Sequence, residues 1–479
     1  MKKYSIILVA LLLLADLIYS FVQHIHMPLD GDMCSIILFE NGYRTILDDP
    51  FGMRAFLHNE IYSAPNRFFA HWTMSAWFKT VPFFFQHFTN PIDSVYLACG
   101  VAKIIFQVGL IYMLALYITG CKKIWSKEWL LAALLVTPLF QTSGYNIVMG
   151  IIDKSVTYSF FYALPLVLLI IYFYPFYKEY FSGKPINFSF LQMLLWSLLP
   201  VYLALNGPLV PGVVIILSTL YLTHRWWIAY QEDQRSSFLK RIFSSILKIP
   251  FTHLFYFVLF GLACLYSLYI GKNNIENQVT MIPLVERFAR LPVGLFNLFT
   301  KKLGPVLLLV FIILNIFLLR KTELNAQGRK ILVLAKWILI FSIIYILLLP
   351  FGGYRPYRPN IIRWDTFMPV MLGMIFIYGL STYYILTNLE LRRKIFYQTS
   401  IAIFMLIFTI ADEPMTTANA CEKDALQKIA ASTQPITVLH NDCSVLDWRK
   451  ISDYRKSETN AKLIKMWKIT EKEKLYYQE

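Results

Sequence analysis

The feature that most constrains this chain is its series of long apolar runs that contain almost no charge. A helix that crosses a membrane needs about 20 consecutive apolar residues. Scanning for such runs predicts about eleven crossings. Charged residues make up only 15% of the chain, against about 25% in a soluble domain. The sequence therefore predicts an all-α polytopic membrane protein.

The predicted crossings differ in how clearly the sequence marks them. The short run at 129–143 and the long run at 188–228 are the least clear, because Asn206, Gly207 and Pro208 divide the long one. In chain order, we expect crossings near 4–22, 94–119, 129–143, 156–176, 188–205, 210–228, 249–270, 305–319, 331–349, 367–386 and 396–410.

Basic residues mark the predicted cytoplasmic side. Lys2 and Lys3 precede the first run, which has no signal-cleavage pattern, so we predict an uncleaved signal anchor with a cytoplasmic N-terminus. The chain holds 45 Lys and Arg against 29 Asp and Glu, a formal charge of +16, and membrane proteins carry such a surplus in cytoplasmic loops rather than for nucleic acid. The basic residues of the predicted inner loops are Lys122, Lys123, Lys127, Lys178, Lys184, Arg225, Arg235, Lys240, Arg241, Lys248, Arg320, Lys321, Arg329, Lys330, Arg392, Arg393 and Lys394.

An odd number of crossings places the end of the chain outside. We divide the chain into a transmembrane domain, 1–411, and a small extracytoplasmic tail, 412–479. The transmembrane domain includes a long outer segment, 24–93. We expect the protein in the bacterial cytoplasmic membrane, with its function on the outer side, because long loops held by a scaffold usually carry function.

Two carboxylates that flank a glycine, Asp30 and Asp32, stand near the start of the outer segment. An apolar stretch follows Asp32, so its carboxylate could cap a helix, which would leave Asp30 without an assigned role. Alternatively, one of the two is a catalytic or metal-binding carboxylate, since partial desolvation at the membrane surface raises the basicity of a carboxylate.

The outer segment continues with many aromatic residues between 62 and 88. Lys79 and Pro82 argue against a further crossing, so we predict interfacial helices whose rings lie at headgroup level. We interpret His71 as an interfacial residue rather than a base, and we include Arg67 among the contacts of a substrate phosphate.

Three arginines lie close together in the outer segment 352–365, where the orientation rule does not ask for positive charge. The neighbouring prolines stiffen the segment, and Tyr354 can hold it at the interface. Guanidinium groups bind phosphate in a two-pronged geometry, so we predict that Arg355, Arg358 and Arg363 bind a phosphate or pyrophosphate headgroup. The alternatives are general headgroup contact and a pairing of Arg363 with Asp365.

Further charged residues lie at the ends of other crossings or inside them. Asp153 and Lys154 precede a crossing, with Asn146 shortly before, and they form either a self-satisfied cap or part of a substrate cleft. Lys103 lies deeper in its crossing, where a cation usually has a partner or a role.

The cysteines favour one disulfide. Of six cysteines, Cys421 and Cys443 lie in the tail, in what should be an oxidising space. We predict that they form a bridge, with two unpaired thiols as the alternative. The sequence has no metal-finger spacing, and we assign no metal ligands.

This layout resembles the polytopic glycosyltransferases of the GT-C fold. They share a signal-anchor crossing, a long outer segment with acidic residues and interfacial helices, many further crossings and an outer tail. The resemblance implies that an acidic residue near the end of the first crossing, here Asp32 or Asp30, acts as general base or helps to bind a metal. It also implies a polyprenyl-phosphate sugar donor whose phosphate contacts Arg355, Arg358 and Arg363. The family's usual Asp-Glu pair is replaced here by Asp-Gly-Asp.

The expected function is sugar transfer from that donor to a glycan, lipid or protein acceptor on the outer face, with a divalent cation left open as cofactor. A polymerase or ligase of surface polysaccharide would use the arginines without Asp30 or Asp32. A transporter of lipid-linked glycan would carry charges in the middle of several crossings. A non-catalytic envelope assembly protein would bind a partner with its outer segments.

Overall fold

The structure is a computed structural model that describes residues 3–40, 42–140, 150–233, 238–279, 281–301, 303–389 and 394–479. Within these ranges, eight helical segments are long and apolar enough to cross a membrane, which agrees with the predicted all-α membrane protein. They are α1 (Lys3–Ile25), α7 (Pro91–Thr119), the run from α9 (Val156–Tyr158) through η2 (Ser159–Ala163) to α10 (Leu164–Ser182), α12 (Val210–Glu232), α14 (Phe251–Gly271), α17 (Gly304–Lys321), α18 (Ala326–Leu348) with η3 (Leu349–Gly352), and α19 (Trp364–Asn388).

Three other predicted crossings form shorter helices. α11 (Phe190–Ala204) and α20 (Lys394–Ile410) have 15 and 17 residues, and α8 (Lys127–Val136) has 10 residues before the turn η1 (Thr137–Phe140). Fifteen helical residues span about 22 Å, less than the roughly 30 Å of a hydrocarbon core. Because these three helices are shorter than the hydrocarbon core, the expected total of about eleven crossings stays a prediction. The predicted polar or basic residues Asn146, Arg235, Arg392 and Arg393 lie outside the described residues.

Three helical segments form the centre of the bundle. The apolar stretches of α7, of the run from α9 to α10 and of α19 are 61%, 67% and 72% buried, against 17% for α1. α19 packs against α7, α8, α17 and α18, and a glycine lets it approach closely. A Cβ at Gly379 would lie 2.8 Å from Ile118 and 2.9 Å from Val136. Small residues at such contacts bring helix backbones together in membranes.

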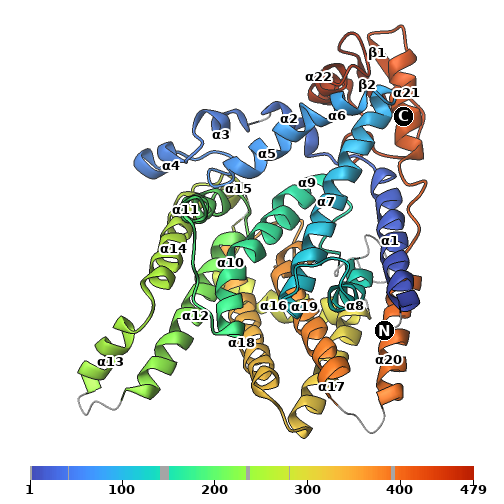
Figure 1. Ribbon diagram of the computed structural model, residues 1–479. Helices are drawn as coiled ribbons and strands as arrows, with labels where there is room; N and C mark the ends of the chain where they lie inside the picture. Colours follow the sequence, from blue (N-terminus) through green and yellow to red (C-terminus); the bar gives the residue numbers. More distant parts are fainter. Residues whose placement is uncertain are drawn as a thin grey trace.

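Short helices form an arm at one end of the bundle (Figure 1). Several apolar side chains on this arm are exposed, among them Phe51, Leu57 and Trp72. Exposed apolar residues on short surface helices are typical of a membrane interface, in line with the prediction of interfacial helices. The arm consists of α2 (Met33–Leu38), α3 (Arg44–Asp48), α4 (Met53–His58), α5 (Phe68–Phe78) and α6 (Val81–Phe85).

The connection after α14 lies beside the arm. Tyr62 and Asn274 form an isolated parallel bridge, in which the Ile275 amide donates to the Tyr62 carbonyl over 3.0 Å. This contact fixes α15 next to the arm. The remaining helices of this part of the chain are α13 (Phe238–Leu247), α15 (Glu276–Val279) and α16 (Leu284–Thr300).

The tail folds onto the arm side of the bundle. Its buried Trp467 donates from Nε1 to the Phe78 carbonyl over 3.0 Å, and its carbonyl accepts from Gln86 over 2.8 Å. The tail also contains a strand at Ile436–Leu439, which pairs in parallel with a second strand. The tail elements are α21 (Ala420–Ala431), β1 (Ile436–Leu439), η4 (Tyr454–Ser457), α22 (Glu458–Met466) and β2 (Leu475–Gln478).

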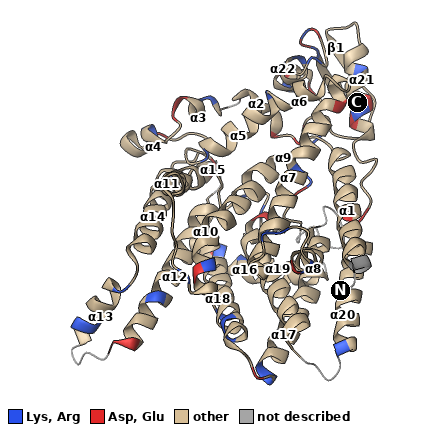
Figure 2. Cartoon of the chain, in the orientation of Figure 1, with Lys and Arg blue, Asp and Glu red and all other residues tan. Residues whose placement is uncertain are grey.

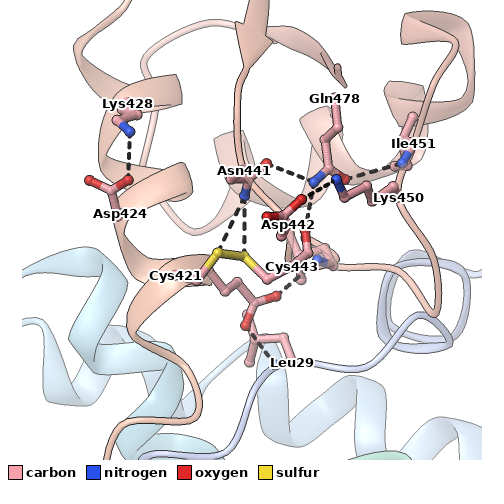
Figure 3. Close-up of a disulfide and its surroundings, with 12 residues drawn as sticks. Leu29, Cys421, Asp424, Lys428, Asn441, Asp442, Cys443, Lys450, Ile451 and Gln478 are labelled. Atoms are coloured by element: carbon pink, nitrogen blue, oxygen red, sulfur yellow. Dashed lines mark hydrogen bonds and ion pairs between the residues drawn. A yellow bond between two sulfur atoms is a disulfide. The ribbon is translucent and has the colours of Figure 1, made fainter.

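The tail contains the predicted disulfide (Figure 3). Cys421 and Cys443 are bonded, with their Cα atoms 6.1 Å apart and a sequence separation of 22. Closing a loop of this size removes roughly 3 kcal/mol of conformational entropy from the unfolded chain. The bridge therefore links α21 to the irregular segment that follows β1.

Charge is distributed unevenly between the two ends of the bundle (Figure 2). At the end away from the tail, the coloured residues near the ends of α12, α13, α17 and α20 are mostly Lys and Arg. Arg320 and Lys321 end α17, and Lys394 begins α20. The arm and the tail lie at the opposite end.

Candidate functional site

The carboxylate of Asp30 is saturated with hydrogen bonds. It is 3% exposed and accepts from Ser155 Oγ and Thr157 Oγ1 over 2.7 Å each, from the Thr157 amide over 3.0 Å and from the Asp32 amide over 3.2 Å. These bonds tie the end of the α1–α2 connection to the start of α9. Both carboxylate oxygens of Asp30, predicted as an alternative base, are thus occupied by donors from within the protein.

Asp32 is the less constrained of the two acids. It precedes α2, but its side chain makes no capping hydrogen bond, so the capping interpretation is wrong. Burial, with the Asp30 charge second, raises the pKa of Asp32 to about 6, while a hydrogen bond from Trp448 acts in the opposite direction. A carboxylate with a pKa near 6 is mostly ionised at neutral pH, yet it is a stronger base than an exposed one.

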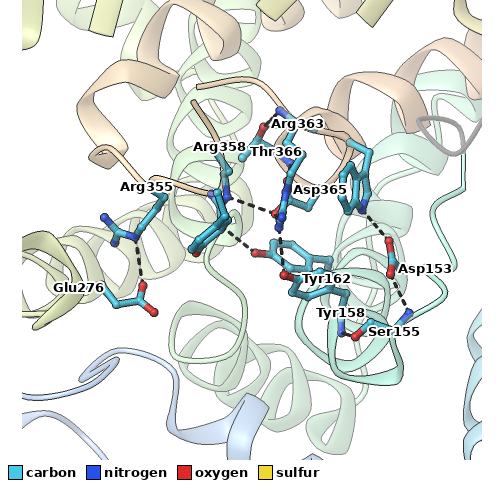
Figure 4. Close-up of polar contacts among 12 residues, drawn as sticks. Asp153, Ser155, Tyr158, Tyr162, Glu276, Arg355, Arg358, Arg363, Asp365 and Thr366 are labelled. Carbon is cyan, nitrogen blue, oxygen red and sulfur yellow. Dashed lines mark hydrogen bonds and ion pairs between the residues drawn. The ribbon is translucent and has the colours of Figure 1, made fainter. Parts of the chain in front are cut away.

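Two of the predicted arginines share one buried carboxylate (Figure 4). Arg363 donates from Nε and Nη2 to the two oxygens of Asp365 over 3.0 and 2.6 Å, which confirms the alternative that this pair forms. Arg358 Nε lies 3.4 Å from the same carboxylate without a hydrogen bond. Asp365 is fully buried at the start of α19. One negative charge thus faces two positive charges.

Tyrosines surround the two arginines. Arg358 Nη2 donates to the Tyr162 hydroxyl over 3.3 Å, and Arg363 Nη2 donates to the Tyr158 hydroxyl over 3.1 Å. The guanidinium groups of both arginines also lie near the Tyr357 ring, at 5.1 and 4.9 Å from its centroid. Aromatic faces and phenol oxygens hold guanidinium groups without neutralising their charge.

A second ion pair lies beside this cluster. Arg355 is 8% exposed and donates to Glu276 over 3.1 Å and to Asn277 over 2.8 Å. Burial raises the pKa of Glu276, but the charges of Arg67 and Arg355 outweigh it and hold the pKa below its usual value. Arg67 Nε is buried and has no hydrogen-bond partner among the described residues.

Aromatic side chains join Asp32 to the arginine cluster. Tyr158, which accepts from Arg363, stacks on Trp448 at 6.0 Å between ring centroids, and it lies within electrostatic range of Asp32. Tyr43 lies within range of Asp32, Glu276 and Arg67. Burial, with the Asp32 charge second, raises the pKa of Tyr43 to about 12. Tyr158 thus faces Asp32 on one side and Arg363 on the other, and Tyr43 faces Asp32 together with Glu276 and Arg67.

Asp153 and Lys154 form part of the framework. Asp153 accepts from the Ser155 amide over 2.8 Å and from Trp364 Nε1 over 2.6 Å. It thereby links the start of α9 to the start of α19. Its pKa is raised to about 6, chiefly by burial. The Lys154 carbonyl accepts from Lys103 Nζ, which gives this buried cation the partner that the sequence did not identify.

Two other predicted residues support the arginines. The Tyr354 carbonyl accepts from Arg355 Nη1 over 2.8 Å, and its ring contacts Arg290 of α16. His71 is 1% exposed, and its Nδ1 bonds to the Arg67 carbonyl over 2.8 Å. Burial lowers the pKa of His71 to about 4, so it is neutral at pH 7 and buried in the protein rather than exposed at the interface.

Sequence reasoning missed several residues of the site. Tyr158 belongs to a predicted crossing, Glu276 to a loop and Trp448 to the polar tail. A tryptophan next to an acidic residue in a polar tail is an unusual position for a large aromatic ring, and it was the one local signal. Their meeting depends on contacts between segments far apart in the chain.

An apolar cavity of about 300 Å³ lies among the helices next to this site. Its lining includes Leu166, Phe341 and Pro369. Leu166 and Pro369 each lie four residues, about one helical turn, beyond Tyr162 and Asp365 of the site. Phe341 belongs to α18. Tyr345 of the same helix donates a hydrogen bond to the Thr366 carbonyl over 3.0 Å, which fixes α18 next to the site. The cavity thus begins about one helical turn from the arginines.

Among the described residues, no group of three or more His, Cys, Asp and Glu side chains is arranged to hold a metal ion. The positive charge at this site comes from its own guanidinium groups. No family model matches this chain, and no curated protein or solved structure matches it either.

Proposed function

We propose that this protein is a GT-C-like membrane glycosyltransferase that moves a sugar from a polyprenyl-phosphate donor to an acceptor on the outer face of the membrane. The observation that carries the proposal is one juxtaposition. A weakly constrained carboxylate, Asp32, and an arginine cluster face the same tyrosine, Tyr158, and an apolar cavity begins about one helical turn from Tyr162 and Asp365.

The proposed orientation puts the N-terminus inside and the arm and tail outside a bacterial cytoplasmic membrane. The basic residues at the opposite end of the bundle support it, because cytoplasmic loops carry excess Lys and Arg. The disulfide of the tail fits an oxidising compartment. About eleven crossings then require α8, α11 and α20 to cross together with neighbouring segments.

The arginines would bind the donor phosphate with different roles. Arg363 and Arg355 already hold Asp365 and Glu276, so they orient the site. Arg358 shares the Asp365 carboxylate with Arg363, and Arg67 Nε has no hydrogen-bond partner among the described residues. The N–H groups of these two arginines can therefore donate hydrogen bonds to a phosphate. Positive charge that faces the departing phosphate is the largest contribution such a site can make to the rate.

The apolar cavity fits the lipid part of the donor. Its lining is formed by aliphatic and aromatic side chains such as Phe173, Tyr177, Trp337 and Phe376. A polyprenyl chain in this cavity would place its phosphate end near Arg358, because the cavity begins about one turn from Tyr162 and Asp365. The sugar would then face Asp32.

The proposed reaction has balanced steps. Asp32 accepts the proton of the acceptor hydroxyl as the oxygen attacks the anomeric carbon. The bond between that carbon and the phosphate oxygen breaks, and polyprenyl phosphate leaves with the electron pair. Attack from the face opposite the phosphate inverts the anomeric configuration. General base catalysis of this kind contributes roughly 10²–10⁴-fold to a rate.

The test compares Asp32→Asn and Arg358→Ala with matched controls in glycan transfer by the purified protein. Asp48→Asn and Arg44→Ala are suitable controls, because both residues lie on the arm in an exposed pair. We expect both site variants to lose transfer and both controls to keep it. Full transfer by both site variants would overturn the proposal, and loss by Arg358→Ala alone would favour a polymerase or ligase.

A further inference from the structure

The tail lies directly against the Asp30–Asp32 turn. A Cβ on Gly31 would lie 2.5 Å from the Trp448 amide nitrogen and 2.7 Å from its Cδ1 atom. No side chain larger than hydrogen fits there unless the tail moves. The backbone before Asp32 and the backbone at Trp448 are therefore in contact, although more than 400 residues separate them along the chain.

We infer that Trp448 is a positioning residue of this site, which holds the turn before Asp32 by close packing against Gly31 and holds the Tyr158 ring with the face of its indole. This inference rests on the proposed function and extends it: the tail completes the active site and is not an appended segment. Trp448 contacts the Asp32 turn with its backbone and Tyr158, a neighbour of the arginines, with its ring. Its ring stacks on Tyr158, which in turn accepts from Arg363.

One buried carboxylate fixes both the segment before Asp32 and the segment before Trp448. Glu422, 1% exposed, accepts from the Leu29 amide over 2.8 Å and from the Leu446 amide over 2.9 Å. Leu29 leads to Asp32, and Leu446 leads to Trp448. The Tyr96 hydroxyl of α7 donates to the same carboxylate over 2.8 Å. The neighbouring disulfide at Cys421, drawn with Leu29 in Figure 3, restrains this junction further.

The chain before Trp448 is also fixed from within the tail. The Tyr476 hydroxyl donates to the Val445 carbonyl over 2.6 Å, and Asn460 Nδ2 donates to the Leu446 carbonyl over 3.1 Å. The indole is nevertheless 52% exposed. The ring therefore stands on a rigid support and is half-exposed beside the Asp32 turn. This arrangement fits a residue that serves the site.

The indole N–H has a specific electrostatic effect. Burial and the charges of Asp30, Glu276 and Asp447 raise the pKa of Asp32, and the neighbouring Trp448 indole is the group that lowers it. The phenols of Tyr43 and Tyr158 also face Asp32. Removing the indole N–H leaves the raising influences unopposed, so Asp32 would hold its proton to a higher pH.

The experiment measures kcat/KM for sugar transfer against pH in Trp448→Phe, which keeps a ring and loses the N–H. We expect the midpoint of the acidic limb to move upward by about half to one pH unit. Tyr454→Phe is the matched control, because Tyr454 is an exposed ring of the same tail. Intact disulfide on a non-reducing gel would show that the tail is folded.

The outcomes separate the two proposals. Transfer that survives Asp32→Asn would remove the proposed function and this inference with it. If Asp32→Asn abolishes transfer while Trp448→Phe leaves the acidic midpoint unmoved, the inference about Trp448 alone is wrong. A lower rate with an unchanged midpoint would show a structural role only.

Discussion

Two polar regions at the arm side of the molecule differ in how completely their groups are paired. Around Asp30 and Glu422, every carboxylate oxygen accepts hydrogen bonds from backbone or side-chain donors. In the second region, the Asp32 carboxylate makes no capping hydrogen bond, and Arg67 Nε has no hydrogen-bond partner among the described residues. Buried polar groups in a protein are normally hydrogen-bonded. The comparison indicates that the first region holds the fold together, whereas the second has capacity for a ligand.

The largest expected effect is on the rate of Asp32→Asn. The variant keeps the shape of the side chain and loses its basicity, so we expect at least a 100-fold loss of transfer. Burial raises the pKa of Asp32 to about 6, so the ionised carboxylate lowers stability increasingly as the pH rises from about 4 to about 6. Asparagine removes that charge, and we expect about 1–3 kcal/mol more stability at pH 7. Denaturant unfolding in detergent checks this sign, and a less stable variant would contradict it.

Asp30→Asn should behave in the opposite way. Its carboxylate accepts from Ser155, Thr157 and the Asp32 amide, and an amide nitrogen cannot accept those bonds. We expect the free energy of unfolding to fall by roughly 3 kcal/mol, because buried donors lose their acceptor. Unchanged unfolding would show that the two acids do not differ as the comparison requires.

Arg67 and Arg355 show the same contrast between a weakly paired and a fully paired group, with a smaller expected effect. Arg67→Ala should raise the KM for the donor about tenfold, with a smaller drop in melting temperature than Arg355→Ala, since Arg67 acts on Glu276 by charge and its Nε has no hydrogen bond to lose. Arg355→Ala should lower the melting temperature, because Glu276 would lose its hydrogen-bonded arginine. Similar melting temperatures in both variants would remove the distinction between free and committed arginines.

The smallest expected effect is in the pH profile of the unmodified protein. Because the pKa of Asp32 lies near 6, kcat/KM should fall about tenfold per pH unit below that value and level off above it. The residual kcat/KM of Asp32→Asn should not change with pH over the same acidic range. An acidic limb that persists in the variant would assign the titration to another group.

Much of this protein could be predicted from local sequence. The apolar runs predict crossing helices, and the expected position of Cys421 and Cys443 in an oxidising space led to the correct disulfide. The pairing of Arg363 with Asp365 followed from two residues on one helix start. These features need only short-range geometry, or the need to place apolar surface in lipid.

The sequence left the roles of the two acids open for a physical reason. It offered Asp32 as a helix cap or as the base, and Asp30 as the alternative base. The donors that occupy Asp30 come from Ser155 and Thr157, more than 100 residues away in the chain. Because a carboxylate bonds to whichever donors reach it, the local pattern could not indicate which acid stays free.

The sequence by itself determined that the chain forms apolar helices, that its charge is biased to one side, and that acidic and arginine-rich segments exist. Hydrophobicity and charge are properties of single segments, and they are readable without a fold. Only the tertiary structure decided that the Asp32 turn, Tyr158, Arg363 and Trp448 lie side by side, since four segments from across the chain converge there. Pairing and burial of polar groups depend on neighbours in space, and these set which groups are left to bind a ligand.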